Sequence, residues 1–345
     1  MKENRPIISV LLPAYNAGKF VGEAITSILN QTFRNFELII INDGSTDNTE
    51  SVIKSFHDDR IRYYKNEHNI KLIKTLNRGL SLARGVYISR MDSDDIALST
   101  MLEEQYYFAI NHPDVDIINI RTYEMSNDGH RVRRFPRTPL LNSESLKYVL
   151  LFQNVITHPG VMLKAEKVKA YQYRDIPSVA NFEDLDLWLR MINDGCCCET
   201  LDSYLLFYRI NESGVTRTLG VDKRNRLRQS YTISIFHDIY GLDVPREKIC
   251  FLFGSCCSFS TPFDTNRFIK RVVLSLITDS DTLRLFKSWY HYRFIISGLQ
   301  MLKTTTFGNK MGILLFILSH PLYIFDSYTM RYLFQRIFNP WKVRK

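Results

Sequence analysis

The sequence predicts an α/β protein in which a doubly wound, mostly parallel sheet is followed by a smaller helical region. Between residues 7 and 120, short apolar segments rich in β-branched residues alternate with segments of helical periodicity. This alternation is typical of parallel strands joined by crossover helices. From about residue 222 the chain becomes helical in pattern, basic and aromatic. We therefore expect two domains, 1–221 and 222–345, for which 345 residues suffice.

The individual elements follow from apolar runs and their spacing. Runs bounded by polar or turn-forming residues predict strands over residues 7–12, 36–41, 61–64, 86–91 and 115–120. Apolar residues three and four apart predict helices over residues 21–28, 46–56, 72–83 and 100–111. Because a helix separates most consecutive strands, these strands are expected to run parallel.

The pattern changes after Tyr123. The Ser-Asn-Asp-Gly segment at 126–129 predicts a hairpin turn. An apolar stripe at i, i+3, i+4 and i+7 predicts a core-anchored helix over 183–193. A further helix is expected over 142–152, with strands over 160–164 and 201–210.

Composition restricts the functional class. The net charge of +9 suits an anionic partner such as a nucleotide, a nucleic acid or an acidic membrane surface. Dispersed basic residues disfavour nucleic acid. The six cysteines show no CxxC spacing, which favours reduced thiols in a cytoplasmic protein. The longest apolar run, 311–325, is interrupted and shorter than the roughly 20 residues that span a bilayer, so no transmembrane helix is expected.

Four polar stretches mark a candidate site. Those at 13–16, 42–45 and 91–95 follow predicted strands, and the fourth, at 181–184, begins a predicted helix. Ligands of open α/β sheets bind outside the carboxyl ends of the strands. We therefore expect the four stretches to meet at one edge, with the carboxylates of Asp94 and Asp184 facing a shared cavity.

The acidic stretch has the chemistry of a metal site. Asp92 and Asp94 are two residues apart at a strand end, so their carboxylates point to one side. Two such carboxylates suit Mg²⁺ or Mn²⁺ bound to substrate phosphates. An acidic loop that caps the following helix is the alternative.

The other stretches suggest a nucleotide and a general base. Asp43 is placed to accept a hydrogen bond from a base N–H, such as the uracil imide, and Tyr15 to stack on that base. A tight turn at Gly44 is the alternative. Asp184, at a helix N-terminus, can act as a general base toward a hydroxyl. Compensation of the helix dipole is the alternative for Asp184.

Together these stretches resemble the family 2 glycosyltransferases, inverting enzymes with the GT-A fold, over about residues 5–215. The resemblance is carried by residues 8–16, 36–47, 87–95 and 183–188. It implies that the nucleotide-sugar donor is bound by Pro13, Ala14, Tyr15, Asp43, Asp92 and Ser93. It also implies that Asp94 and Asp92 hold Mn²⁺ or Mg²⁺ on the diphosphate, and that Asp184 is the catalytic base.

The resemblance also implies a reaction class. The stretch 154–163, with its His-Pro-Gly, is similar to that of bacterial members that build surface polysaccharides. Its implied partners are a nucleotide-diphosphate sugar, UDP-linked, and a glycan or lipid-linked oligosaccharide acceptor. No Gln-x-x-Arg-Trp motif follows Asp184, so we expect the transfer of a single sugar rather than polymerisation.

Two positions depart from the family pattern. Asn42 stands where many members have an aspartate, and Leu76 stands where many have a diphosphate-contacting arginine. Lys71 or Lys74 could replace that arginine.

Other functions stay open at this point. One is a non-catalytic nucleotide-sugar-binding scaffold, against which the presence of both Asp94 and Asp184 argues. Another is a nucleotidyltransferase, for which the expected glycine-rich phosphate loop is missing after the first strand.

The C-terminal region suggests a membrane contact. Aromatic residues such as Phe316, Tyr323 and Phe334 are interleaved with basic residues such as Arg331 and Arg336. This composition suits peripheral docking on the anionic inner face of the plasma membrane. A helical subdomain with an aromatic core is the alternative.

Overall fold

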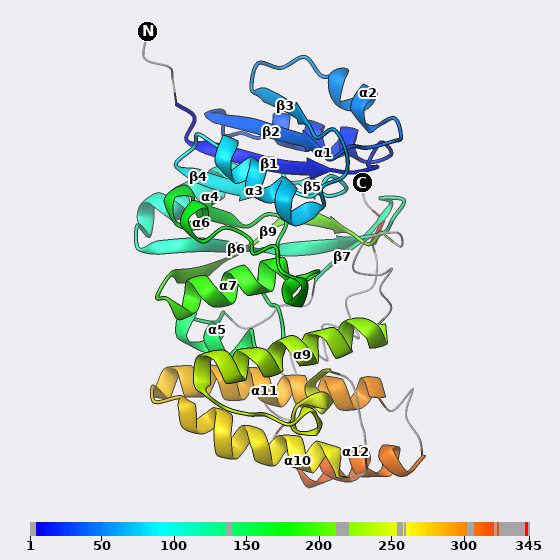
Figure 1. Cartoon of the computed structure of the whole chain (residues 1–345), viewed down its shortest axis with the longest axis vertical. Helices are drawn as coiled ribbons and strands as arrows, with labels where there is room; N and C mark the ends of the chain where they lie inside the picture. Colours follow the sequence, from blue (N-terminus) through cyan, green and yellow to red (C-terminus); the bar gives the residue numbers. More distant parts are fainter. Residues whose placement is uncertain are drawn as a thin grey trace. The chain divides into compact units, whose positions relative to one another are not determined.

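The computed structural model describes residues 5–135, 140–211, 221–253, 258, 260–301, 307–320, 323 and 342–343. Its contacts divide the chain into two compact units (Figure 1). The first contains the described residues within 1–135, 156–212 and 341–345, and the second those within 136–155 and 213–340. The second unit thus includes residues 140–155, which the expected boundary at 221 assigns to the first domain.

The first unit is built on a mostly parallel sheet. Its parallel strands are β1 (Ile8–Ala14), β2 (Phe36–Asn42), β3 (Ile61–Lys65) and β4 (Tyr87–Arg90), in the order β4-β1-β2-β3. Beyond β4 follow β8 (Met162–Lys164), β6 (Val115–Met125), β7 (Arg131–Arg134) and β10 (Lys342–Val343). β9 (Cys197–Arg209) pairs with β6 and with β5 (Ile96–Ala97). The expected fold class is confirmed.

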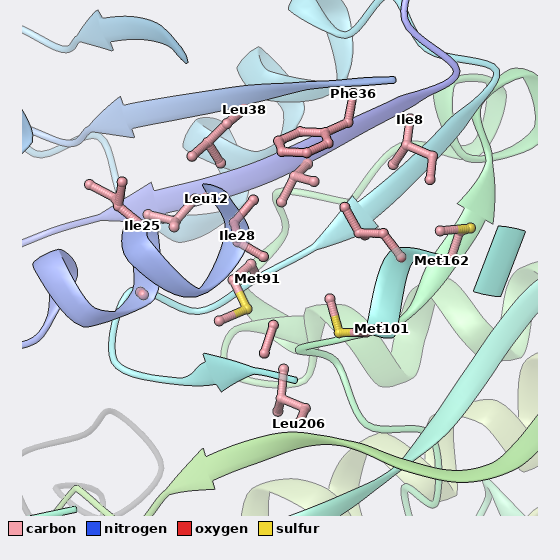
Figure 2. Packing of buried hydrophobic residues seen from close by; sticks show 14 of the residues in the cluster. Ile8, Leu12, Ile25, Ile28, Phe36, Leu38, Met91, Met101, Met162 and Leu206 are labelled. Carbon is pink, nitrogen blue, oxygen red and sulfur yellow. The ribbon is translucent and has the colours of Figure 1, made fainter. Parts of the chain in front are cut away.

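Helices cover both faces of this sheet. They are α1 (Val21–Leu29), α2 (Thr49–Lys54), α3 (Leu72–Leu82), α4 (Met101–Asn111), α6 (Ala165–Tyr171), the short η1 (Pro177–Val179) and α7 (Glu183–Asn193). On one face, Ile8 and Leu12 share a buried cluster with Ile25 and Ile28 of α1 (Figure 2). On the other face α3 approaches Leu11 at Gly79, where an added Cβ would lie 2.1 Å from Leu11 Cδ1. Every residue of β1 and β2 is therefore buried, as in a doubly wound sheet.

The predicted elements agree with the structure best where their periodicity is strongest. The strands expected at 36–41 and 61–64 and the helices expected at 72–83 and 183–193 match to within one residue. The hairpin is also confirmed, because β6 and β7 pair across Gly129, whose φ is +78°.

Two features were not predicted from the sequence, and one strand boundary differs from the expectation. β8 runs antiparallel to both neighbours, β4 and β6, because its three residues are too few to show their direction in the sequence. β5 and α6 were not predicted, since β5 has only two residues and α6 begins directly after β8. β9 begins at Cys197 rather than at residue 201, because its first four residues, Cys-Cys-Glu-Thr, show no alternation of apolar and polar side chains.

The second unit is helical. It contains α5 (Ser143–Val149), α9 (Val221–Tyr240), α10 (Thr261–Phe268), α11 (Ser280–Met301) and α12 (Phe307–Ser319). Shorter turns are η2 (Arg246–Lys248), η3 (Cys250–Phe253), η4 (Ile269–Val273) and η5 (Leu274–Leu276). Its core is aromatic: the ring of Trp289 lies 6.1 Å from that of Phe152 and 5.4 Å from that of Phe286. The contact of Phe152 explains why residues 140–155 belong to this unit.

The C-terminal aromatic residues that the structure describes are part of this core. Phe316 and Tyr323 are both buried, whereas Phe334, Arg331 and Arg336 lie outside the described residues. Among the helices described, none has the length and apolarity required to cross a bilayer. Among the described cysteines, Cys196, Cys198 and Cys250 are buried.

Candidate active site

The loops after β1 and β2 are tied together by hydrogen bonds. The backbone N–H of Asn16 donates to Ser45 Oγ at 3.0 Å, and that of Thr46 donates to Asn16 Oδ1 at 2.9 Å. Asn16 adopts φ +47°, which turns the chain directly after Tyr15. Tyr15 is 49% exposed, so its ring is available to a ligand, whereas Pro13 and Ala14 are buried in β1.

Asp43 lies at the carboxyl end of β2 and is held in place. Its Oδ1 accepts hydrogen bonds from Asn66 Nδ2 at 2.7 Å and from the backbone N–H of Ile70 at 2.9 Å. Its own N–H donates to Ala14 O at 2.8 Å. Both contacts to the carboxylate use Oδ1, so the group is oriented by the protein before any ligand binds.

The departure at Asn42 has a structural reason. Its Oδ1 accepts from the N–H of Ser45 at 3.0 Å, while its Nδ2 donates to Tyr63 Oη at 3.2 Å. An ionised aspartate has no donor, so it would keep the second bond only with the Tyr63 hydroxyl as the donor. Asn42 therefore shapes the turn that presents Asp43.

Three carboxylates gather after β4. Asp92, Asp94 and Asp95 each offer an oxygen within 4.8 Å of the others. Burial, followed by the charge of Asp92, raises the pKa of Asp94 to about 6. A hard divalent cation fits this set, because oxygen ligands are what Mg²⁺ and Mn²⁺ prefer and the cation would relieve the repulsion. Ser93 lies between the first two carboxylates and is partly buried.

The end of β9 holds the acidic loop in place. The backbone N–H of Arg209 donates to Asp95 Oδ1 at 2.7 Å, and Arg209 Nε donates to the carbonyl of Asp94 at 2.7 Å. Asn211 Nδ2 reaches Asp94 Oδ2 at 3.2 Å. Sequence reasoning missed both residues, since they lie more than a hundred positions away along the chain.

Arg90, the last residue of β4, was also missed. Its Nη2 lies 2.5 Å from Asp92 Oδ1, and its side chain is only 4% exposed. Its Nε and Nη1 are buried with no hydrogen-bond partner among the described residues. The sequence contained a signal for Arg90, because an arginine at the end of a strand expected to be buried needs a counter-charge nearby.

The acidic pair that begins α7 belongs to the same electrostatic cluster. Burial, then the charge of Asp184, raises the pKa of Glu183 to about 7, and Asp92 adds to this effect while Arg90 opposes it. Burial raises the pKa of Tyr173, and the charges of Asp184, Glu183 and Asp92 raise it further while that of Arg90 lowers it. The stretches at 92–95 and 183–184 thus act on one another electrostatically. Asp184 Oδ1 also accepts from the N–H of Leu185 at 2.7 Å.

His158 lies behind this cluster and is structural. Its Nε2 is 2.9 Å from Tyr173 Oη, and its ring meets the edge of Trp188. Burial, together with the charge of Arg90, holds the pKa of His158 well below its usual range. A neutral His158 is therefore a packing and hydrogen-bonding group.

The predicted substitutes for the missing arginine lie on α3 or at its start. Leu76 is fully buried, and Lys74 Nζ is 3.5 Å from Asp175 Oδ2 in an exposed pair. Lys71 adopts φ +75° directly before the helix.

A hollow of about 550 Å³ lies beside α1 and β5 and contains no predicted site residue. This hollow is not the cavity expected between Asp94 and Asp184, so that shared cavity stays a prediction.

Comparison with known proteins identifies the chain. A family model described as glycosyl transferase family 2 matches residues 9–169. An uncharacterized glycosyltransferase of Methanocaldococcus jannaschii is 31% identical over 234 residues, which cover 67% of this chain and 79% of that protein. The chain belongs to glycosyltransferase family 2. The O-antigen biosynthesis glycosyltransferase WbnJ of Escherichia coli is 31% identical over 219 residues, 61% of this chain and 83% of that protein.

Solved structures show the same GT-A fold in this family 2 chain. TarS of S. aureus, in complex with UDP-GlcNAc, has a TM-score of 0.54 at 16% identity and covers 95% of this chain and 91% of that one. The mannosyltransferase PcManGT of Pyrobaculum calidifontis, in complex with GDP-Man and Mn²⁺, has a TM-score of 0.52 at 14% identity, with coverages of 97% and 88%. The protein is therefore a glycosyltransferase, and family membership sets the scaffold and nucleotidyltransferase alternatives aside.

Proposed function

We propose that this glycosyltransferase moves a single sugar from a UDP-linked donor to a hydroxyl of a glycan or lipid-linked acceptor, with inversion at the anomeric carbon. The reaction would serve bacterial surface-polysaccharide synthesis on the cytoplasmic side of the membrane. The observation that carries the proposal is the cluster of the Asp92, Asp94 and Asp95 carboxylates directly after β4, whose oxygens lie within 4.8 Å of one another.

Six of the predicted site residues have roles in the proposed mechanism. The base of the nucleotide stacks on Tyr15 and donates an N–H to Asp43. Asp92 and Asp94 hold the divalent cation, Mn²⁺ or Mg²⁺, which supplies charge stabilisation for the departing diphosphate. Ser93, between these ligands, lies against the donor. Asp184 takes the proton of the acceptor hydroxyl as its oxygen attacks the face opposite the diphosphate.

Three features support this assignment of roles. The carboxylate of Asp43 is fixed through Oδ1 alone, which suits recognition of a single N–H. The carboxylates of Asp92 and Asp94 lie within reach of one cation. The relatives named for O-antigen and teichuronic acid biosynthesis favour an acceptor of the bacterial surface.

The experiment compares Asp184→Asn with Asp194→Asn, the same substitution at the exposed end of α7. Purified protein is given UDP-, GDP- and dTDP-sugars with Mn²⁺, and both donor binding and nucleotide release are measured. We expect Asp184→Asn to lower turnover by about 10²–10⁴-fold with donor affinity nearly unchanged. We expect Asp194→Asn to behave like the wild type. Substantial turnover by Asp184→Asn would reject the base, and preference for another nucleotide would reject the UDP donor.

A further inference from the structure

Helix α12 has an apolar face on the surface of the second unit. Met311, Leu314 and Leu315 are between 40% and 44% exposed, and Leu318 is 72% exposed. These positions follow i, i+3, i+4 and i+7 and therefore form one continuous stripe.

The opposite face of the same helix is buried in the unit. Ile313 and Phe316 are almost inaccessible. The ring of Phe316 packs 5.3 Å from that of Phe263 on α10, and Gly298 of α11 brings the backbone close to Ile313. Figure 1 shows α12 along α10 and α11. A helix that is apolar all round is typical of a core or a membrane environment. Because the unit covers only one face of α12, we expect the exposed stripe to contact another apolar surface.

The net positive charge of the chain comes from the second unit. Its ranges 136–155 and 213–340 hold 19 lysines and arginines against 9 aspartates and glutamates, a net charge of +10. The rest of the chain has 26 against 27, a net charge of −1. The charge asymmetry therefore marks this unit as the one that meets an anionic partner.

Basic side chains also lie on α10, which packs against α12, and on the η4 segment that follows α10. Lys270 Nζ is 5.9 Å from the ring centre of Tyr323, which packs on Phe316. Arg267 and Arg271 are exposed on the same segment, and Lys310 precedes the stripe on α12 itself. Long basic side chains of this kind keep their charge at lipid headgroups while apolar neighbours enter the acyl region.

We propose that the stripe of Met311, Leu314, Leu315 and Leu318 docks on an anionic lipid bilayer, with α12 parallel to the membrane plane. The 13 residues of α12 are too few to span a bilayer. A second copy of this chain fits the face less well, because two units of charge +10 would repel each other. The inference goes beyond the proposed function, since the binding needs neither donor nor acceptor.

The test measures co-sedimentation of the full chain with vesicles. One set contains about one third phosphatidylglycerol in phosphatidylcholine and the other phosphatidylcholine alone. The variant Leu315→Ser/Leu318→Ser is compared with Leu227→Ser/Ile239→Ser, which removes two apolar side chains, each 41% exposed, from α9. A third variant, Arg267→Glu/Arg271→Glu, reverses the charge of two exposed basic side chains of the second unit.

We expect the wild type and the α9 variant to bind anionic vesicles, with affinity that falls as salt is added. The α12 variant should bind at least about tenfold more weakly, and the charge-reversal variant several-fold more weakly. Binding of the α12 variant equal to that of the wild type would overturn the proposal. So would failure of the wild type to bind, or a change from dimer to monomer caused by the α12 substitutions. Donor turnover by the α12 variant, measured without vesicles, reports separately on the proposed function.

Discussion

Replacing Arg90 by methionine tests whether a buried cation holds the acidic cluster together. Arg90 is 4% exposed and its Nη2 lies 2.5 Å from Asp92 Oδ1. Breaking a buried ion pair by removing one partner costs about 3–5 kcal/mol. Two buried nitrogens of Arg90, Nε and Nη1, have no hydrogen-bond partner among the described residues, and this lowers the stability that Arg90 contributes. We therefore expect a loss of about 3 kcal/mol near pH 8, or roughly 6–12 °C in Tm.

The loss should depend on pH in a defined direction. Arg90 lowers the pKa values of Asp94 and Glu183, so these values rise further in Arg90→Met. The folded variant then binds more protons than the folded wild type, and lowering the pH from 8 to about 5 should recover part of the lost stability. Divalent cations should also raise Tm more in the variant than in the wild type, because they replace the missing positive charge.

The assay is thermal unfolding at pH 8 and at about pH 5, with and without Mn²⁺. Arg84→Met is the matched control, since Arg84 also pairs with a carboxylate, Glu37, but is 47% exposed. That variant should lose at most about 1 kcal/mol. Equal losses for the two variants, or a loss from Arg90→Met that is the same at both pH values, would refute the reasoning.

Three further predictions follow from individual residues. The pKa of Glu183 is raised to about 7 from an ordinary 4.5, so the folded state is favoured below pH 4.5 and loses that stability as the pH rises through 7. Glu183→Gln should therefore raise stability by about 1–2 kcal/mol at pH 8 and have little effect near pH 5, as measured by thermal unfolding at each pH. Asp94→Ala should remove the Mn²⁺ dependence of donor binding, measured by calorimetry with and without the metal, and an unchanged metal dependence would contradict the assigned ligand. Gly160→Ala should cost about 2–4 kcal/mol, because φ is +86° and the new Cβ would lie 2.5 Å from Ile120 Cδ1. Gly195 also has a positive φ, +93°, but nothing lies near its added Cβ, so Gly195→Ala should cost only about 1 kcal/mol. Both variants are measured by thermal unfolding, and equal losses of stability would contradict a steric clash at Gly160.

The part of the protein that could be predicted from its sequence is the part governed by local chemistry. The runs at 36–41 and 8–12 are apolar except for Glu37 and Ser9, and so many apolar side chains in succession can be buried only in a sheet covered on both faces. The stripe from Leu185 to Ile192 can bury its apolar face only as a helix, and α7 has the expected bounds. The positions of the polar motifs followed from this alternation, because a parallel sheet places the residues after its strands at one edge.

Only the tertiary structure decided which residues support those motifs. Arg209 and Asn211 reach the acidic loop because β9 pairs with β5 and β6. The local sequence of β9 does not encode the register of this pairing. The direction of β8 depends on its neighbours, because a strand of three residues makes too few local interactions to set its own orientation. Arg90 stands out in the sequence as a charged residue in a strand, but only the structure shows that its side chain is buried and pairs with Asp92. Pairing between side chains that are distant in the sequence depends on the backbone path of many intervening residues. Hydrophobic periodicity, by contrast, can be recognised within about ten consecutive residues.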